Sequence, residues 1–184
     1  MKRSKILIIA ILSCFNLYCQ NDTIDYAFLN SALTQVPTIK RDSDYFLLMN
    51  QTKIWGTRVT SSNSYKETEN KIDTTTLKEL VTKLNSTWKT VVLLDKKRIS
   101  KKTKAKLVSV KKTWQIWEDI SERKHVKKEI VFTCSMPVFD SKKEYAIIEI
   151  DGGFGSLAMQ GWKCLFKKNE NEWQLIAKFD NWCN

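Results

Sequence analysis

The fold is decided by residues 162–179, WKCLFKKNENEWQLIAKF, which have the pattern of a β-hairpin. Apolar residues recur at every second position in each half, as they do on one face of a strand. In the first half Trp162 and Phe166 share a face, and in the second half Trp173 and Phe179 do. The pattern therefore predicts two antiparallel strands with their tryptophans turned to one core.

The register of this hairpin follows from the same pattern. The polar segment Lys167–Glu172 predicts the turn, and Phe166 then pairs with Trp173. This pairing sets Cys164 opposite Leu175, so that inward-facing residues meet inward-facing residues. Ile176 and Leu165 are exceptions to the alternation.

Two more strands precede the hairpin, at Glu129–Met136 and Tyr145–Asp151. A glycine-rich corner, residues 152–155, follows the second of them and predicts a sharp turn or bulge. Nearer the N-terminus, Asp22–Val36 and a segment opening at Asp73 have helical periodicity. Tyr45–Met49 is a short apolar run typical of a strand.

These elements predict one α+β domain over residues 21–184. We expect an antiparallel sheet of four to six strands, with one or two N-terminal helices packed on one face. The length of 184 residues suffices for one sizeable core.

Residues 1–20 have the pattern of an export signal peptide, with a basic start and a short apolar run. Cys14 follows Ser13 as in a relaxed bacterial lipobox, which would make Cys14 a lipidated first residue. The alternative is ordinary cleavage near Cys19 or Gln20. Either outcome places the protein in the periplasm, outside the cell or on the outer surface as a lipoprotein, and Cys14 is its one expected link to a membrane.

The chain is basic, with a formal charge of +11 that becomes +8 without the three cations of the signal peptide. Nine cations and no acid lie within Lys96–Lys112, followed by Trp114 and Trp117. We expect the back half of this segment to be a strand, with Thr113–Glu122 open between helix and strand. Basic residues near aromatics can bind single-stranded nucleic acid, but export argues against that partner and favours an envelope protein or polymer.

Cys134, Cys164 and Cys183 remain after ordinary cleavage, and an oxidising compartment permits one disulfide. Cys164–Cys183 is the preferred pair, with Cys134 as a rival partner. The alternative is that all three are small buried apolar residues.

The candidate ligand-binding residues surround the glycine-rich corner: Asp151, Gly153, Phe154 and Gly155. Their backbone N–H groups could hold an anion. Glu149 and Asp151 share a strand face, where two carboxylates form either an acid/base pair, a calcium site or a solvated surface. His125 stands among cations and is expected at the surface. No catalytic residue, cofactor or metal site is predicted. With one His and no CxxC pair, the chain lacks the usual ligands of a zinc site.

The C-terminal third also carries a resemblance, through Ser135–Phe139, Tyr145–Ile150, the glycine-rich corner, and Leu165–Lys168 leading to Glu172-Trp173. In these segments the chain resembles short exported bacterial proteins of unknown function. The order of a helix first and a Trp-bearing hairpin last resembles the cone-shaped α+β fold of nuclear transport factor 2-like proteins. Neither resemblance implies catalytic residues.

The leading functional hypothesis is therefore an exported, non-enzymatic binding or accessory protein of the cell envelope. A second hypothesis is a small hydrolase that uses Glu149 or Asp151 on an envelope polymer. A third is an immunity-type protein that binds an acidic toxin domain through its basic face.

Overall fold

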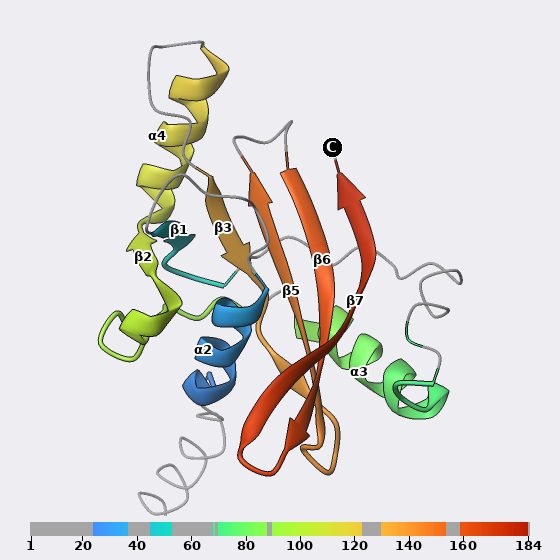
Figure 1. Ribbon diagram of the computed structural model, residues 1–184. Helices are drawn as coiled ribbons and strands as arrows, with labels where there is room; N and C mark the ends of the chain where they lie inside the picture. Colours follow the sequence, from blue (N-terminus) through green and yellow to red (C-terminus); the bar gives the residue numbers. More distant parts are fainter. Residues whose placement is uncertain are drawn as a thin grey trace, which may run out of the picture.

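The structure is a computed structural model, in which residues 180–183 are described by their backbone alone. It describes these parts of the chain: residues 24–36, 45–52, 68, 70–87, 90–122, 130–153 and 159–183. Within these parts, one mixed β-sheet lies between helices (Figure 1).

The described strands form a seven-stranded sheet, with β4 (Val138–Phe139) paired to β5 beside the main path. The main path runs in the order β2 (Ala105–Val108), β1 (Phe46–Met49), β3 (Val131–Cys134), β5 (Tyr145–Gly153), β6 (Met159–Asn169) and β7 (Glu172–Cys183). The α+β class is confirmed, but the sheet has more strands than we expected.

The sheet is not purely antiparallel, because β1 runs parallel to both β2 and β3. The pairs from β3 to β7 are antiparallel, as predicted. Parallel neighbours need a long crossover connection, which is usually a helix. Helix α3 (Thr74–Ser86) lies between β1 and β2 in the chain, and helix α4 (Val110–Ser121) lies between β2 and β3.

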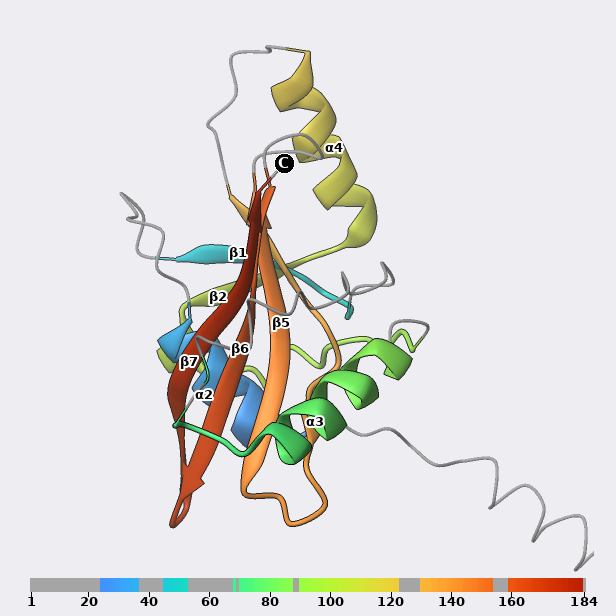
Figure 2. The ribbon, with the colours of Figure 1, turned by 90° about the vertical axis from the view of Figure 1, so that its right-hand side faces the viewer.

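The helices cover both faces of the sheet, whereas the sequence predicted one covered face. Helix α2 (Tyr26–Gln35) packs on the face that we call the first face, which carries Phe132, Ile148 and Phe166. Helix α3 packs on the second face against Ile147 and Leu165. Figure 2 views the sheet nearly edge-on, with α2 on one side and α3 and α4 on the other.

Each helix begins at a side chain that caps it. Asp25 caps α2 by accepting from the backbone N–H of Phe28 at 3.0 Å, so this helix begins later than the predicted Asp22. Asp73 caps α3 as predicted, accepting from Thr76 at 2.9 Å.

The strand that we expected over Lys106–Lys112 is present only in its first part, and helix α4 replaces the rest. Strand β2 stops at Val108, and the Ser109 hydroxyl accepts from the Lys112 backbone N–H at 3.2 Å, which caps the helix. Thr113 and Trp117, four residues apart, then turn the same buried face to the sheet. Trp117 contacts a third cluster on the second face, formed with Leu47, Val131 and Met159.

The C-terminal hairpin is present, but its register differs from the predicted one. Trp173 lies opposite Lys168 and Leu175 lies opposite Phe166, because the turn holds two residues, with Glu170 at φ 53°. The strands are therefore longer than the sequence pattern indicated. Trp162 and Trp173 do lie in the same first-face cluster, as expected.

A β-bulge at Ile176 explains why this residue breaks the alternation. Leu175 pairs with Phe166 and Ala177 with the adjacent Leu165, so that Ile176 is one residue extra on β7. Before the bulge, Trp173 and Leu175 pack on the first face. After it, Ala177 and Phe179 pack on the second face.

Helix α2 also covers the outer edge of β7 near the turn. The Gln35 side chain accepts from the Leu175 backbone N–H at 2.9 Å and donates to the Trp173 carbonyl at 2.7 Å. The Ser31 hydroxyl donates to the same carbonyl at 3.0 Å. One side-chain amide thus makes the two hydrogen bonds that a neighbouring peptide would make, which protects this edge from unwanted pairing.

Gly152 lies inside β5 rather than in a corner, and its lack of a side chain is required there. It stands opposite Phe132, whose ring lies over it. A Cβ built on Gly152 would come within 2.6 Å of Phe132 Cε1, closer than packed carbon atoms can approach. Gly152 thus leaves room for the Phe132 ring against the sheet.

We predict that Gly152→Ala lowers the free energy of unfolding by about 1–3 kcal/mol, because the added methyl group overpacks the core. Chemical denaturation of the purified protein measures this. Phe132→Leu removes the ring that Cβ would meet, so Gly152→Ala should cost less in that background. Strictly additive effects would show that the clash is not the cause.

Candidate functional site

Four polar side chains lie buried together on the second face of the sheet, and we call them the charged band. They are Thr133 on β3, Glu149 and Asp151 on β5, and Lys163 on β6. Their exposed fractions are 0%, 2%, 2% and 1%. Charged residues are almost never this deeply buried unless they are paired, so the band is the most unusual feature of the core.

The strand register places the members of the band side by side. Glu149 stands directly opposite Lys163, and Asp151 stands opposite Thr133 on one side and Gly161 on the other. Directly opposed residues in an antiparallel pair have Cβ atoms about 4.5–5.5 Å apart. The band therefore brings two carboxylates and one ammonium group together within two rows of the sheet.

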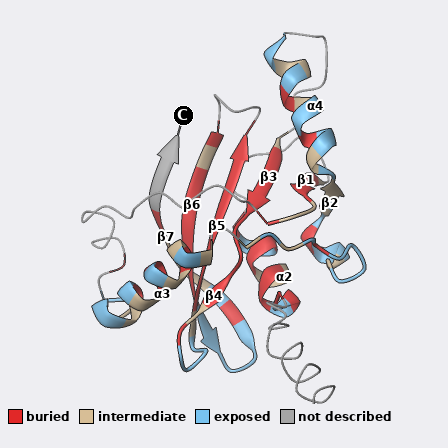
Figure 3. Ribbon diagram, turned by 180° about the vertical axis from the view of Figure 1, so that it is seen from behind, coloured by how far each residue is buried: buried red, intermediate tan, exposed pale blue. Residues whose placement is uncertain are grey.

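Apolar clusters border the band at both ends. Toward α3 lie Ile147, Leu165 and Phe179, and toward α4 lie Leu47, Val131 and Met159. Figure 3 shows the resulting buried centre of the sheet, in contrast to the exposed tip of the hairpin.

The sequence identified the two carboxylates but not their lysine. Glu149 and Asp151 do share a face, yet the face is buried, so they are not the solvated surface that was one alternative. The alternation of the hairpin places Lys163 on the face away from Trp162 and Phe166, but that face is covered too, and Lys163 is buried. The sequence did contain a signal that both faces are covered, because Leu165 and Ile147 interrupt the alternation. Strands buried on both faces are apolar nearly throughout.

The backbone around Glu149 is fixed by Ser135. The Glu149 backbone N–H donates to the Ser135 hydroxyl at 3.0 Å, and its carbonyl accepts from the Ser135 backbone N–H at 2.9 Å. The same hydroxyl donates to the Met136 carbonyl at 3.0 Å. Ser135 thus fixes the backbone of β5 beside the end of β3. These contacts use only the backbone of Glu149, whose side chain belongs to the charged band.

The burial of the band limits its chemistry. A carboxylate that hydrolyses a polymer must touch the bond it cleaves, and neither carboxylate is exposed enough for that. Within the described residues, no group of three or more His, Cys, Asp or Glu side chains could hold a metal ion.

Two of the four predicted ligand-binding residues lie inside a buried strand. Asp151 and Gly153 both belong to β5 and are buried. Phe154 and Gly155 lie outside the described residues, as do His125, Cys14 and the predicted signal peptide.

The expected Cys164–Cys183 disulfide is absent, because Cys164 is a free, buried thiol. Cys134 is buried as well. The backbone of Cys183 lies opposite Gln160, four residues from Cys164 along β6. At about 3.3 Å per residue this offset is roughly 13 Å. A disulfide joins Cα atoms no more than about 7 Å apart.

Burial raises the pKa of the Cys164 thiol to about 12. The positive charge of Lys178 acts against this rise, and the negative charges of Asp151 and Glu149 add to it. The thiolate is the reactive form of cysteine, so Cys164 is an inert apolar residue of the core.

A second candidate site is the exposed surface that we call the basic edge. It runs from the loop after Asp95 through the 3-10 helix η3 (Lys101–Thr103) and the edge strand β2 to the first turn of α4. Its cations are Lys96, Lys97, Arg98, Lys101, Lys102, Lys104, Lys106, Lys111 and Lys112, and all of them are exposed. Figure 1 shows η3, β2 and α4 one above another along this side of the molecule.

Aromatic rings near the basic edge are partly covered by its own cations. The Arg98 guanidinium lies 4.1 Å from the centre of the Tyr26 ring, and Lys106 Nζ lies 3.2 Å from that of Tyr45. Trp114 is 49% exposed and packs edge-to-face on buried Trp117 at 5.3 Å. The basic edge therefore offers one large aromatic surface, at its α4 end.

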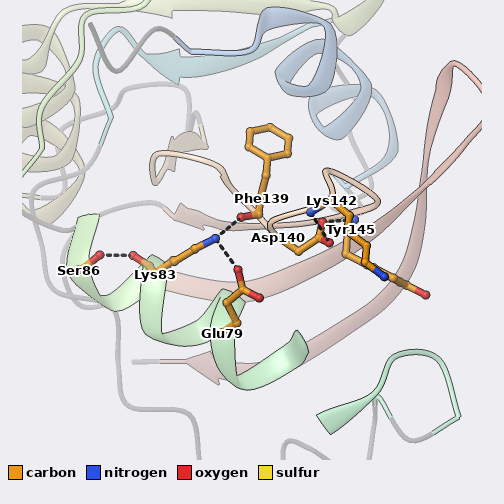
Figure 4. A network of polar contacts seen from close by, with 7 residues as sticks. All are labelled: Glu79, Lys83, Ser86, Phe139, Asp140, Lys142 and Tyr145. Carbon is orange, nitrogen blue, oxygen red and sulfur yellow. Dashed lines mark hydrogen bonds and ion pairs between the residues drawn. The ribbon is translucent and has the colours of Figure 1, made fainter. Parts of the chain in front are cut away.

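A cleft of about 330 Å³ lies between the end of α3 and the loop around β4. Figure 4 shows its polar contacts: Lys83 pairs with Glu79 at 2.5 Å and donates to the Phe139 carbonyl at 3.0 Å. The Asp140 carboxylate accepts from the backbone N–H groups of Tyr145 and Lys142. These contacts fix the helix end and the turn, so they have a structural role.

No family model, curated protein or solved structure matches this chain. The two resemblances drawn from the sequence stay predictions. In the part of the chain that the structure describes, none of the helices has the length and apolar character needed to cross a membrane.

We predict that Lys163→Met destabilises the protein by about 3–5 kcal/mol, because it leaves buried carboxylates without their neighbouring cation. Denaturant unfolding measures the loss. Lys167→Met on the same strand is the control: its side chain is exposed, so its effect should stay within about 0.5 kcal/mol. The double variant Lys163→Met/Glu149→Gln should lose less than the sum of the single variants, and plain additivity would contradict the pairing.

We predict that iodoacetamide at pH 9 modifies Cys164 in the denatured protein but not in the native protein. The labelling in denaturant should need no reductant, because Cys164 is a free thiol. The folded pKa lies above the unfolded one, so the thiol stabilises the fold at pH values below about 8.5. This contribution falls as the pH rises toward about 12. Peptide mass spectrometry measures the labelling. A Cys164 that is labelled in the native protein contradicts the burial, and one that needs reductant first contradicts the free thiol.

Proposed function

We propose that the protein is an exported, non-enzymatic binding or accessory protein of the bacterial cell envelope, and that it holds an anionic partner on its basic edge. One observation carries this proposal: the nine cations of residues 96–112 are all exposed, and no acid lies among them. Such a surface attracts anions at a distance and raises the rate at which they bind.

Two features of the sequence support the location. Residues 1–20 have the pattern of an export signal, and the remaining chain keeps a charge of +8. The envelope of a bacterium presents phosphate and carboxylate groups, so a basic exported protein meets anionic partners there.

Burial of the charged band favours binding over catalysis. The hydrolase hypothesis required a polymer to reach Glu149 or Asp151, and both carboxylates are 2% exposed. The nine cations of the basic edge, in contrast, are exposed. An immunity-type protein would use the same edge to bind an acidic protein. The two hypotheses therefore differ in the chemistry of the partner.

We predict that the mature protein binds isolated bacterial envelopes and that binding weakens roughly tenfold between about 0.05 and 0.3 M salt, because salt screens exposed charges. Co-sedimentation of the labelled protein measures binding. In the edge variant, Gln replaces Lys101, Lys102, Lys111 and Lys112. At low salt this variant should bind the envelopes more weakly than the natural protein does.

The matched control carries the same substitutions at four exposed lysines elsewhere: Lys71, Lys78, Lys142 and Lys167. Both variants have the same net charge. If they bind equally well, overall charge and not the basic edge causes the binding. Binding that does not respond to salt would contradict the proposed function.

A further inference from the structure

We propose that the partner of the basic edge is a linear anionic polysaccharide, an inference that rests on the proposed function. The first reason is the shape of the edge. The lysines of η3 and of the first turn of α4 are separated by strand β2, whose four residues span about 13 Å. Lys106 lies between them. The charges therefore form a row along an edge, which suits a chain lying lengthwise.

The second reason is that the row consists almost entirely of lysine. The single arginine, Arg98, lies against Tyr26. Lysine is a strongly hydrated point charge, whereas arginine forms planar bidentate contacts. Lysine is also depleted at the centre of protein–protein interfaces, where arginine and aromatic residues are enriched. The row therefore fits hydrated, spaced carboxylate or phosphate groups better than the surface of a folded acidic protein.

The third reason is the small number of available aromatic and apolar side chains. Single-stranded nucleic acid binds by stacking its bases on aromatic rings, but cations already lie over Tyr26 and Tyr45. Trp114 offers one half-exposed ring, enough for one sugar ring to lie against. A lipid surface is held by charge together with buried apolar side chains. Of the described large apolar side chains that are exposed, Trp114 alone lies on the basic edge.

The edge strand itself adds hydrogen-bonding groups. β2 ends the described sheet, and β1 is its partner on one side. The backbone N–H and C=O groups along the other side of an edge strand are open to hydrogen bonding. Sugar hydroxyls both donate and accept, so a polysaccharide can use this row of groups while its acidic groups meet the lysines.

The test compares defined polyanions on the full mature protein, by calorimetry at low salt. The probes are polygalacturonate, poly-glutamate, a thymidine oligonucleotide, vesicles of phosphatidylglycerol in phosphatidylcholine, and uncharged dextran. We expect polygalacturonate to bind most tightly and dextran not to bind. The edge variant should bind polygalacturonate about tenfold more weakly, and the matched control variant within about twofold of the natural protein. Trp114→Ala should also weaken polygalacturonate binding while leaving poly-glutamate binding unchanged.

The outcomes separate this inference from the proposed function. If poly-glutamate, the oligonucleotide or the vesicles bind as tightly as polygalacturonate and depend on the same lysines, the inference of a polysaccharide partner is wrong. The proposed binding of anions by the basic edge is then still supported. If none of the anions binds, or the matched control loses as much affinity as the edge variant, the basic edge is not a binding site and both proposals fail.

Discussion

The burial of both faces of β5 and β6 is the constraint on which the rest of the structure depends. Ile148 and Phe166 pack under α2 on the first face, while Ile147 and Leu165 pack under α3 on the second. A sheet covered on one side would leave half of these side chains in water, at a cost of about 1.5–3 kcal/mol for each large one. The long β5–β6–β7 ribbon is stable because helices cover it on both sides.

The same constraint produces the charged band. Once the second face is covered, the residues that point to it at the centre of the sheet are buried, including Glu149, Asp151 and Lys163. Opposite charges placed directly across the strands can offset part of the cost of removing them from water. The band is thus a consequence of the architecture, and it is the part of the core most sensitive to the loss of one partner.

The basic edge lies where this double covering ends. Strand β2 is the last described strand on that side, and Lys104 just before it and Lys106 within it are exposed. Lysines on an edge strand discourage pairing with other sheets. The charge that discourages such pairing is the same charge that, in our proposal, attracts an anionic partner.

The sequence by itself determined the local elements: the capped helix α3 with its apolar stripe, the hairpin with both tryptophans on one face, and the run of exposed cations. Each follows from spacing within a few residues, which local geometry converts directly into structure. Only the tertiary structure decided the rest: the parallel pairing of β1, the bulge at Ile176, the free thiol of Cys164 and the burial of Lys163. These features depend on which distant parts of the chain pack against each strand. A polar residue on a strand has the same spacing whether its face meets solvent or a second layer, so the sequence pattern does not distinguish the two.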